Sequence, residues 1–326
     1  MKTWTGSLAF AISGAVFLMT TGNSPAQGPE DKDRPSLNYP QARRGDVVEN
    51  YHGTRVADPY RWLEDIDSAE TRAWVEAENR VTDTYLESIP ERSKIKDRLT
   101  KLWDYEKYGI PDQEGGRYFY TYNTGLQNQS VLFTTKSLGG DARELLDPNT
   151  LSKDGTVALS GLSITEDGSK MAYALADAGS DWMKWKVRNV ETGEDTPDEI
   201  LWSKFSGAEW TPDGSGFFYG RFPEPKEGDD LKAANYFQKM YFHKLGTAQK
   251  DDLLIWKDDE HKDWRADPTV TDDGKYLVLT LGKGTDDKYR ILYRPLDKPD
   301  AEPVHLVGNF DHEYTFIDND GPIFWF

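Results

Sequence analysis

The stretch Ser163-Ile164-Thr165-Glu166-Asp167-Gly168-Ser169-Lys170 decides the fold of this chain of 326 residues, because the same sequence pattern recurs twice later in the chain. Residues 208–214 and 269–276 repeat it: an apolar or Thr-rich run leads to an Asp-Gly pair, and an aromatic or apolar run follows. Asp-Gly favours the tight turns that join antiparallel strands. We therefore interpret the three stretches as equivalent hairpins of successive sheets.

The Asp-Gly pairs recur at a nearly regular spacing. Those that begin at Asp167, Asp213, Asp273 and Asp320 are 46, 60 and 47 residues apart, near the period of a four-stranded propeller blade. We predict a mainly β fold in which residues 111–326 form an incomplete β-propeller of about four blades. A β-sandwich with frequent Asp-Gly turns is the alternative, and the sustained period favours the propeller.

Short alternating runs predict the strands themselves. These runs are residues 118–122, 131–135, 171–175, 217–219, 240–242, 276–281 and 291–293. The final run, residues 321–326, is apolar and has no turn or cap after it. We therefore expect the chain to hold only part of the propeller.

Before the propeller, we predict an N-terminal helical segment over residues 39–110. Asp67 followed by Glu70 has the pattern of a capping box and predicts the start of one helix. Ser88 and Glu91 repeat the pattern, and Pro90 would occupy the first turn of a second helix, where its missing N–H costs little.

The first 26 residues have the pattern of a signal peptide. Lys2 supplies a positive charge, an uncharged apolar run extends from Leu8 to Met19, and Ser24-Pro25-Ala26 offers a cleavage site. Residues 27–38 are polar and predict a linker. We expect a periplasmic or secreted protein with no membrane contact after cleavage; an uncleaved anchor is the alternative. The chain has no cysteine, so no disulfide can form.

Composition and motifs exclude several kinds of chemistry. A formal net charge of −18 argues against nucleic acid and anionic membranes as partners. The chain has no Gly-x-Ser-x-Gly nucleophile elbow, and its five histidines are scattered. Acidic residues close to His261 and His312 lack the spacing of a zinc site. We predict no catalytic residue, no metal site and no cofactor in this chain.

Two further stretches carry a resemblance to a known family. Val56-Ala57-Asp58-Pro59-Tyr60-Arg61-Trp62-Leu63-Glu64-Asp65 resembles the N-terminal signature of the prolyl oligopeptidase family of serine peptidases, and Gly125 to Phe133 resembles its first propeller strands. The resemblance continues in family order over about residues 39 to 326. Its other matching phrases are Gly179 to Trp182, Lys204 to Gly207 with Trp210-Thr211, Gln238 to His243, and Leu245 to Thr247.

The resemblance implies a fold, an activity and partners. In this family a seven-bladed propeller covers an α/β-hydrolase domain, onto which the N-terminal helical segment packs, and restricts entry to short peptides that are cut after proline. The catalytic serine, aspartate and histidine belong to that C-terminal domain, so we expect this chain alone to be inactive. The resemblance also implies substrate contacts at Phe205, Arg265 and Thr285, although the last two differ in type from the family's residues.

Three functions remain open from the sequence. In the first, which we favour, the chain is the N-terminal and propeller part of an exported prolyl oligopeptidase. In the second it is a peptide-binding propeller module without catalysis. In the third it is part of a peptidase similar to oligopeptidase B, which cuts after basic residues. The apolar final run argues against the module. The phrase from Gly125 to Phe133 argues against oligopeptidase B.

Overall fold

The computed structural model describes residues 37–226, 234–298 and 301–326, which fall into two compact units divided between Ile95 and Lys96. The predicted signal peptide and nearly all of the predicted linker lie outside the described residues, and the boundary at residue 110 stays a prediction. In the part of the chain that is described, no helix is long and apolar enough to cross a membrane.

The first unit contains a short hairpin and a long helix. Strands β1 (Val48–Tyr51) and β2 (Thr54–Ala57) pair antiparallel, and a 3₁₀ turn at Arg61–Glu64 precedes α1 (Ala69–Ser88). The N-cap of α1 is Ser68 and not Asp67: the Ser68 hydroxyl accepts a hydrogen bond from the Thr71 N–H at 3.1 Å. The Asp67 carboxylate accepts a hydrogen bond from Arg72 instead, at 2.7 Å.

The predicted start of the second helix was also wrong. Ser88 is the last residue of α1, where its hydroxyl donates to the Tyr85 carbonyl at 2.6 Å. Ile89 precedes Pro90, and a residue before proline is disfavoured in the helical region, so the chain leaves the helix there. Helix α2 (Arg92–Trp103) begins two residues after the proline.

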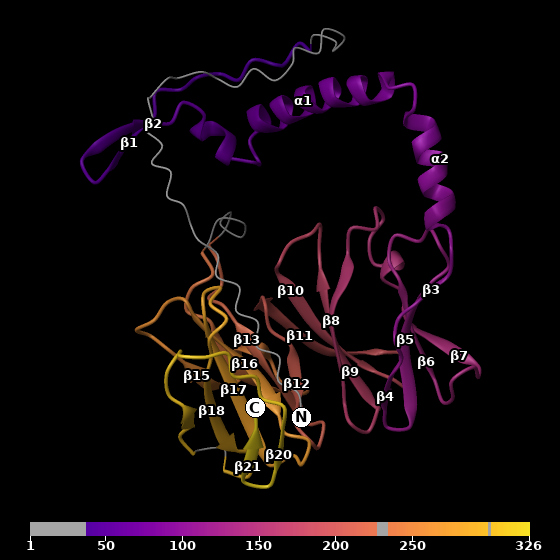
Figure 1. Ribbon diagram of the computed structural model, residues 1–326, viewed down its shortest axis with the longest axis vertical. Helices are drawn as coiled ribbons and strands as arrows, with labels where there is room; N and C mark the ends of the chain where they lie inside the picture. Colours follow the sequence, from indigo (N-terminus) through magenta and orange to yellow (C-terminus); the bar gives the residue numbers. More distant parts are fainter. Residues whose placement is uncertain (1–36, 227–233, 299–300) are drawn as a thin grey trace, which may run out of the picture. The chain divides into compact units, whose positions relative to one another are not determined.

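The second unit consists of successive antiparallel sheets (Figure 1). The first blade contains β3 (Lys107–Tyr108), β4 (Asp112–Glu114), β5 (Arg117–Asn123), β6 (Val131–Thr135) and β7 (Ala142–Leu146). The second blade contains β8 (Ala158–Ile164), β9 (Lys170–Ala176), β10 (Met183–Asn189) and β11 (Asp195–Ser203). The third contains β12 (Ala208–Trp210), β13 (Gly216–Arg221), β14 (Lys239–Lys244) and β15 (Leu253–Lys257). The fourth contains β16 (Trp264–Val270), β17 (Tyr276–Lys283), β18 (Arg290–Pro295) and β19 (Val304–Val307), and the hairpin β20 (Asp318–Asp320) and β21 (Ile323–Trp325) follows.

The Asp-Gly pairs form equivalent hairpins, as predicted. They join β8 to β9, β12 to β13, β16 to β17 and β20 to β21. In the first of these turns the Thr165 hydroxyl donates to Asp167 Oδ1 at 2.7 Å, and the Gly168 N–H donates to the Thr165 carbonyl at 2.7 Å. Gly168 has a φ of +67°, a conformation that glycine adopts without steric cost.

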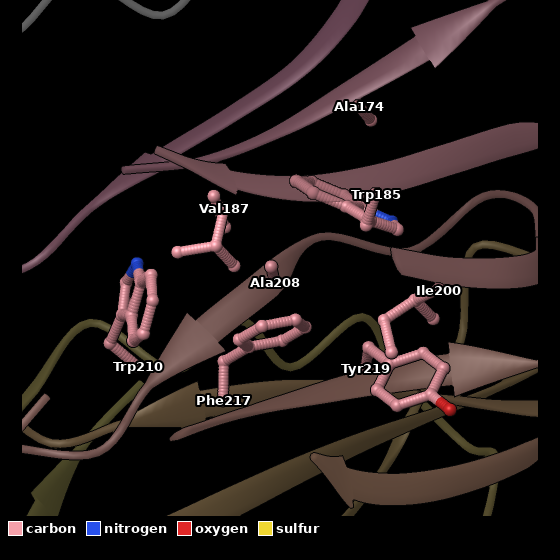
Figure 2. Packing of buried hydrophobic residues seen from close by; sticks show 9 residues of the cluster. Ala174, Trp185, Val187, Ile200, Ala208, Trp210, Phe217 and Tyr219 are labelled. Carbon is pink, nitrogen blue, oxygen red and sulfur yellow. The ribbon is translucent and has the colours of Figure 1, made fainter. Parts of the chain in front are cut away.

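Successive blades bury their cores against one another. Between the second and third blades, Trp185, Val187 and Ile200 meet Trp210, Phe217 and Tyr219, and Figure 2 shows these side chains facing one another between the two sheets. A second cluster, centred on Phe119 and Met171, joins the first and second blades, and a third, centred on Phe218 and Leu279, joins the third and fourth. A sandwich would have a single core between two sheets. This series of interfaces between successive blades confirms an incomplete propeller.

Candidate functional site

Strand topology brings several loops to one end of the blades. In an antiparallel meander, successive connections alternate between the two ends of the strands. The Asp-Gly turns occupy one end. Loops 177–182, 204–207, 258–263 and 284–289 lie at the other end, which we name the loop face. All three substrate contacts that the sequence predicted belong to this face or to the strand ends beside it.

Phe205 lies in the loop that connects β11 to β12. Its side chain is 44% exposed, so it is not a buried core residue. Its φ of +52° lies in the left-handed region, which is rare for a bulky residue and marks a local constraint. Phe205 lines a cavity of about 440 Å³ together with Gly161, Met183 and Trp185.

Both neighbours of Phe205 are fixed in place. The Lys204 side chain is buried, its Nζ lies 3.8 Å from the centroid of the Trp182 ring, and it donates a hydrogen bond to Asn235 at 3.1 Å. Burial lowers the pKa of Lys204, and the negative charge of Asp181 partly opposes that shift. On the other side, the Ser206 hydroxyl accepts a hydrogen bond from the Gly220 N–H at 2.8 Å. The chain on both sides of Phe205 is therefore held in place.

Arg265 and Thr285 lie on the fourth blade. Arg265 is the second residue of β16 and pairs with Gly282 of β17, and its Nε is buried without a hydrogen-bond partner. Thr285 is exposed in the loop after β17. No hydrogen bond or ring contact joins Phe205, Arg265 and Thr285 within the described chain, so their shared role in substrate binding stays a prediction.

A series of residues that lie next to one another nevertheless connects the Phe205 loop to β16. A Cβ atom built on Gly220 would lie 3.0 Å from the Ser206 side chain and 2.6 Å from the Gln238 amide nitrogen. Gln238 is buried, and its carbonyl oxygen accepts a hydrogen bond from the Ala266 N–H at 2.7 Å. Gly220 of the third blade thus lies next to Ser206, which follows Phe205, and next to Gln238, which bonds the residue that follows Arg265.

Sequence reasoning missed a buried polar cluster between the second and third blades. His243 of β14 contacts Asp252 through Nδ1 at 2.7 Å and Asp198 of β11 through Nε2 at 3.1 Å. The three side chains are almost fully buried. Within the described residues, the hydrogen-bond partners of the ring are these two carboxylates and no serine or threonine nucleophile, so the cluster joins two blades and lacks the third member of a triad. Its only sequence signal was His243 itself, at an inward position of a strand.

Four carboxylates lie beside the Asp-Gly turns, at the end opposite the loop face. Glu114, Glu166, Glu209 and Asp272 line a cavity of about 530 Å³. Burial, with a smaller contribution from Glu166, raises the pKa of Glu114. Among the described residues, no group of three or more His, Asp or Glu side chains has the arrangement of a metal site.

Comparisons with known proteins identify the family. A model of the family described as prolyl oligopeptidase, N-terminal beta-propeller domain, matches residues 39–326. The prolyl endopeptidase of Elizabethkingia meningoseptica is 38% identical over 285 residues, which cover 87% of this chain and 40% of that protein. Prolyl oligopeptidase A of Amanita bisporigera is 34% identical, over 88% of this chain and 42% of its own length.

Solved structures agree. Prolyl oligopeptidase B from Galerina marginata, bound to a 35mer hydrolysis and macrocyclization substrate, matches with a TM-score of 0.75 and 30% identity, over 87% of this chain and 43% of its own. The chain therefore spans less than half the length of these relatives. Because the family model covers nearly all of the described residues, the chain belongs to the prolyl oligopeptidase family, of which it carries the N-terminal β-propeller region.

Proposed function

We propose that the chain is the N-terminal and propeller part of an exported prolyl oligopeptidase, a serine-type endopeptidase that cleaves short peptides after proline. In this proposal the propeller restricts the access of substrates to an α/β-hydrolase domain that supplies the serine, aspartate and histidine. Phe205, with Arg265 and Thr285 as weaker candidates, contributes to the substrate pocket from the loop face. Short peptides that contain proline are the substrates, and nucleic acid has no part.

The observation that carries the proposal is the family match over residues 39–326 together with the constrained, half-exposed Phe205 on the loop face. An exposed aromatic ring beside a cavity suits the apolar side of a proline-containing peptide. The relatives described above bear prolyl endopeptidase or prolyl oligopeptidase names, which favours cleavage after proline over cleavage after basic residues.

Activity measurements on two proteins test the proposal. The chain of 326 residues should not hydrolyse a chromogenic peptide with proline at the cleaved position. The protein encoded by the complete reading frame should hydrolyse it, and a serine-directed fluorophosphonate should abolish that turnover. A stop codon directly after Phe326, or turnover by the chain alone that the fluorophosphonate abolishes, would contradict the proposal that a separate hydrolase domain supplies the catalytic residues.

Export is tested separately, by intact mass. The protein recovered from the periplasm or medium should begin near Gln27, because small residues at Ser24 and Ala26 offer a signal-peptidase site. A mass that includes residues 1–26 would support an uncleaved anchor instead.

A further inference from the structure

A second cavity beside the loop face has a concentration of positive charge that the proposed peptidase function leaves unexplained. It has a volume of about 510 Å³, and its lining includes Arg221, Lys239, Lys250, Trp202, Phe222 and Tyr241. The whole chain has a formal net charge of −18. Three cations that share one cavity are therefore unexpected in this protein.

The strand register places two of these cations directly opposite each other. Arg221 at the end of β13 pairs with Lys239 at the start of β14, and like charges directly opposite in a sheet are destabilising. Lys239 in turn pairs with Lys257 of β15, which has Asp259 as its ion-pair partner.

Arg221, Lys239 and Lys250 have no such partner. None of them forms an ion pair with a carboxylate in the part of the chain that the structure describes, although Glu224 also lines the cavity. Among the described residues, these adjacent like charges therefore have no carboxylate within ion-pair distance. A bound anion would offset their mutual repulsion.

The groups around the cavity are held rigidly. The Arg221 guanidinium carbon lies 3.9 Å from the centroid of the Tyr241 ring, so the planar fork is stacked and its position is set. The Gln249 side chain accepts from the Leu201 N–H at 3.1 Å and donates to the Leu201 carbonyl at 2.9 Å. This clamp fixes the short 3₁₀ turn Gln249–Asp251, on which Lys250 lies.

Trp202 forms an aromatic wall and is itself strained. Its φ is +62°, an unfavourable conformation for a bulky residue that persists only where its surroundings enforce it. Its ring packs edge-on against Trp182 at 5.5 Å, and its carbonyl accepts a hydrogen bond from the Phe222 N–H at 2.9 Å. Asp181 and Met183, which flank Trp182, line the Phe205 cavity. The Trp182–Trp202 pair thus lies between the two cavities.

We infer that this basic cavity binds a carboxylate group that is attached to an apolar or aromatic body. A guanidinium held flat presents parallel N–H donors to the two oxygens of a carboxylate, Lys239 and Lys250 add charge, and Trp202 and Tyr241 supply apolar contact. The carboxylate can belong to an acidic peptide or to a small free organic acid, since both present the same group.

Calorimetric titration of the protein encoded by the complete reading frame distinguishes these sources. The probes are the dipeptides acetyl-Phe-Glu-amide and acetyl-Phe-Gln-amide, which differ in one carboxylate, and 3-phenylpropionate as a free acid with an aromatic body. We expect the Glu peptide to bind at least about tenfold more tightly than the Gln peptide, and Arg221→Gln with Lys239→Gln to remove that difference. Arg221→Lys, which keeps the charge and loses the planar fork, should remove most of it.

Lys244→Gln is the matched control, because Lys244 is an exposed lysine at the other end of β14 and does not line the cavity. It should leave the preference for the Glu peptide unchanged. Binding of 3-phenylpropionate alone, lost in the double variant, would support the inference with a free acid as the ligand. Absence of binding by both acids, or equal losses in the Lys244 control, would overturn it. Proline-peptide cleavage has no part in this readout, so the peptidase proposal stands or falls separately.

Discussion

Phe205 shows how one residue can combine exposure with constraint. A bulky residue in the left-handed region costs about 1–3 kcal/mol, and its neighbours Lys204 and Ser206 hold it there through buried contacts. A ring that only filled the core would be buried, whereas this one is nearly half exposed beside a cavity. The strained backbone conformation of Phe205 therefore keeps its ring at the surface, beside the cavity.

Substitution of Phe205 in the full-length protein, assayed for the proposed peptidase activity, separates these roles. Phe205→Ala should raise KM for proline peptides more than it lowers kcat, because loss of an aromatic contact costs about 1–3 kcal/mol. Phe205→Gly should raise KM equally and should not lower Tm, since glycine adopts this φ without strain. An unchanged KM with a lower Tm in both variants would assign Phe205 a purely structural role.

His243 joins the second and third blades through two buried carboxylates. Burial alone would lower its pKa, but hydrogen bonds and charge interactions with Asp252 and Asp198 raise the pKa above the ordinary value. The Tyr219 hydroxyl donates to Asp252 at 2.6 Å and the Thr196 hydroxyl to Asp198 at 2.6 Å. The charged imidazole is therefore favoured in the folded protein.

This shift predicts how stability depends on pH. Because the pKa of His243 is raised on folding, the stabilisation by the charged imidazole is complete below the pKa of the unfolded state, about 6.5. This stabilisation is lost as the pH rises through the pKa of His243 in the folded state. Thermal unfolding of the full-length protein between about pH 6 and 9 should show the parent losing stability with rising pH. His243→Gln should lower the free energy of unfolding by about 3–5 kcal/mol at pH 6, because two buried carboxylates lose their partner.

The control is His305→Gln, since His305 is exposed on β19. It should match the parent in stability and in pH dependence. If the His243 variant has the same slope against pH as the parent, the buried histidine is not charged in the folded state.

At the scale of elements, the hairpin turns recur because one local hydrogen-bond pattern recurs. In the turns at Asp167, Asp213 and Asp273, a threonine two residues earlier donates to the aspartate, and the aspartate accepts the N–H two residues later. These bonds, that from Thr165 above all, lower the pKa of Asp167 to about 2. The first blade has Gly115-Gly116 at the equivalent position, so a search for Asp-Gly alone could not find it.

Gly168 tests whether adjacent turns must approach closely. Its φ is +67°, and a Cβ atom there would lie 2.7 Å from the Glu114 carbonyl oxygen of the preceding blade. Gly179 has a similar φ of +76° with no atom within 4 Å. Both alanine variants should lose about 1–2 kcal/mol from the left-handed backbone, and Gly168→Ala should lose more because backbone must move. Chemical denaturation measures both; equal losses would show that the contact between turns is unimportant.

At the scale of the whole molecule, the described sheets form a series and not a closed ring. Propellers protect their edges by closing, and unpaired strand edges promote association. Large apolar side chains are exposed on β21 and on α2, among them Ile323, Trp325, Leu99 and Trp103. These features favour self-association of the isolated chain.

Residues 27–326 should therefore associate or fold poorly when they are produced alone. Size-exclusion chromatography with light scattering is expected to show species larger than a monomer, and heating is expected to give a broad transition. A sharp monomer peak with cooperative unfolding would argue that the chain is a self-sufficient module, and would favour the binding-module alternative.

The sequence alone determined seven of the strands, the four Asp-Gly hairpins and the family. Alternation and the Thr-x-Asp-Gly pattern are local, so they act within a few residues whatever the rest of the chain does. The predicted helix starts were wrong. Asp67 and Ser68 are both capping residue types, and in the structure Ser68 caps α1 while Asp67 pairs with Arg72.

Tertiary structure alone decided which distant residues meet. Asp198 and His243 become partners, and Arg221, Lys239 and Lys250 come to share a cavity, because blades pack against one another in a particular register. A sequence period sets how often a blade recurs, but it does not specify which side chains of two neighbouring blades face each other. That choice depends on how the interface between the blades fills with side chains, which no local pattern records.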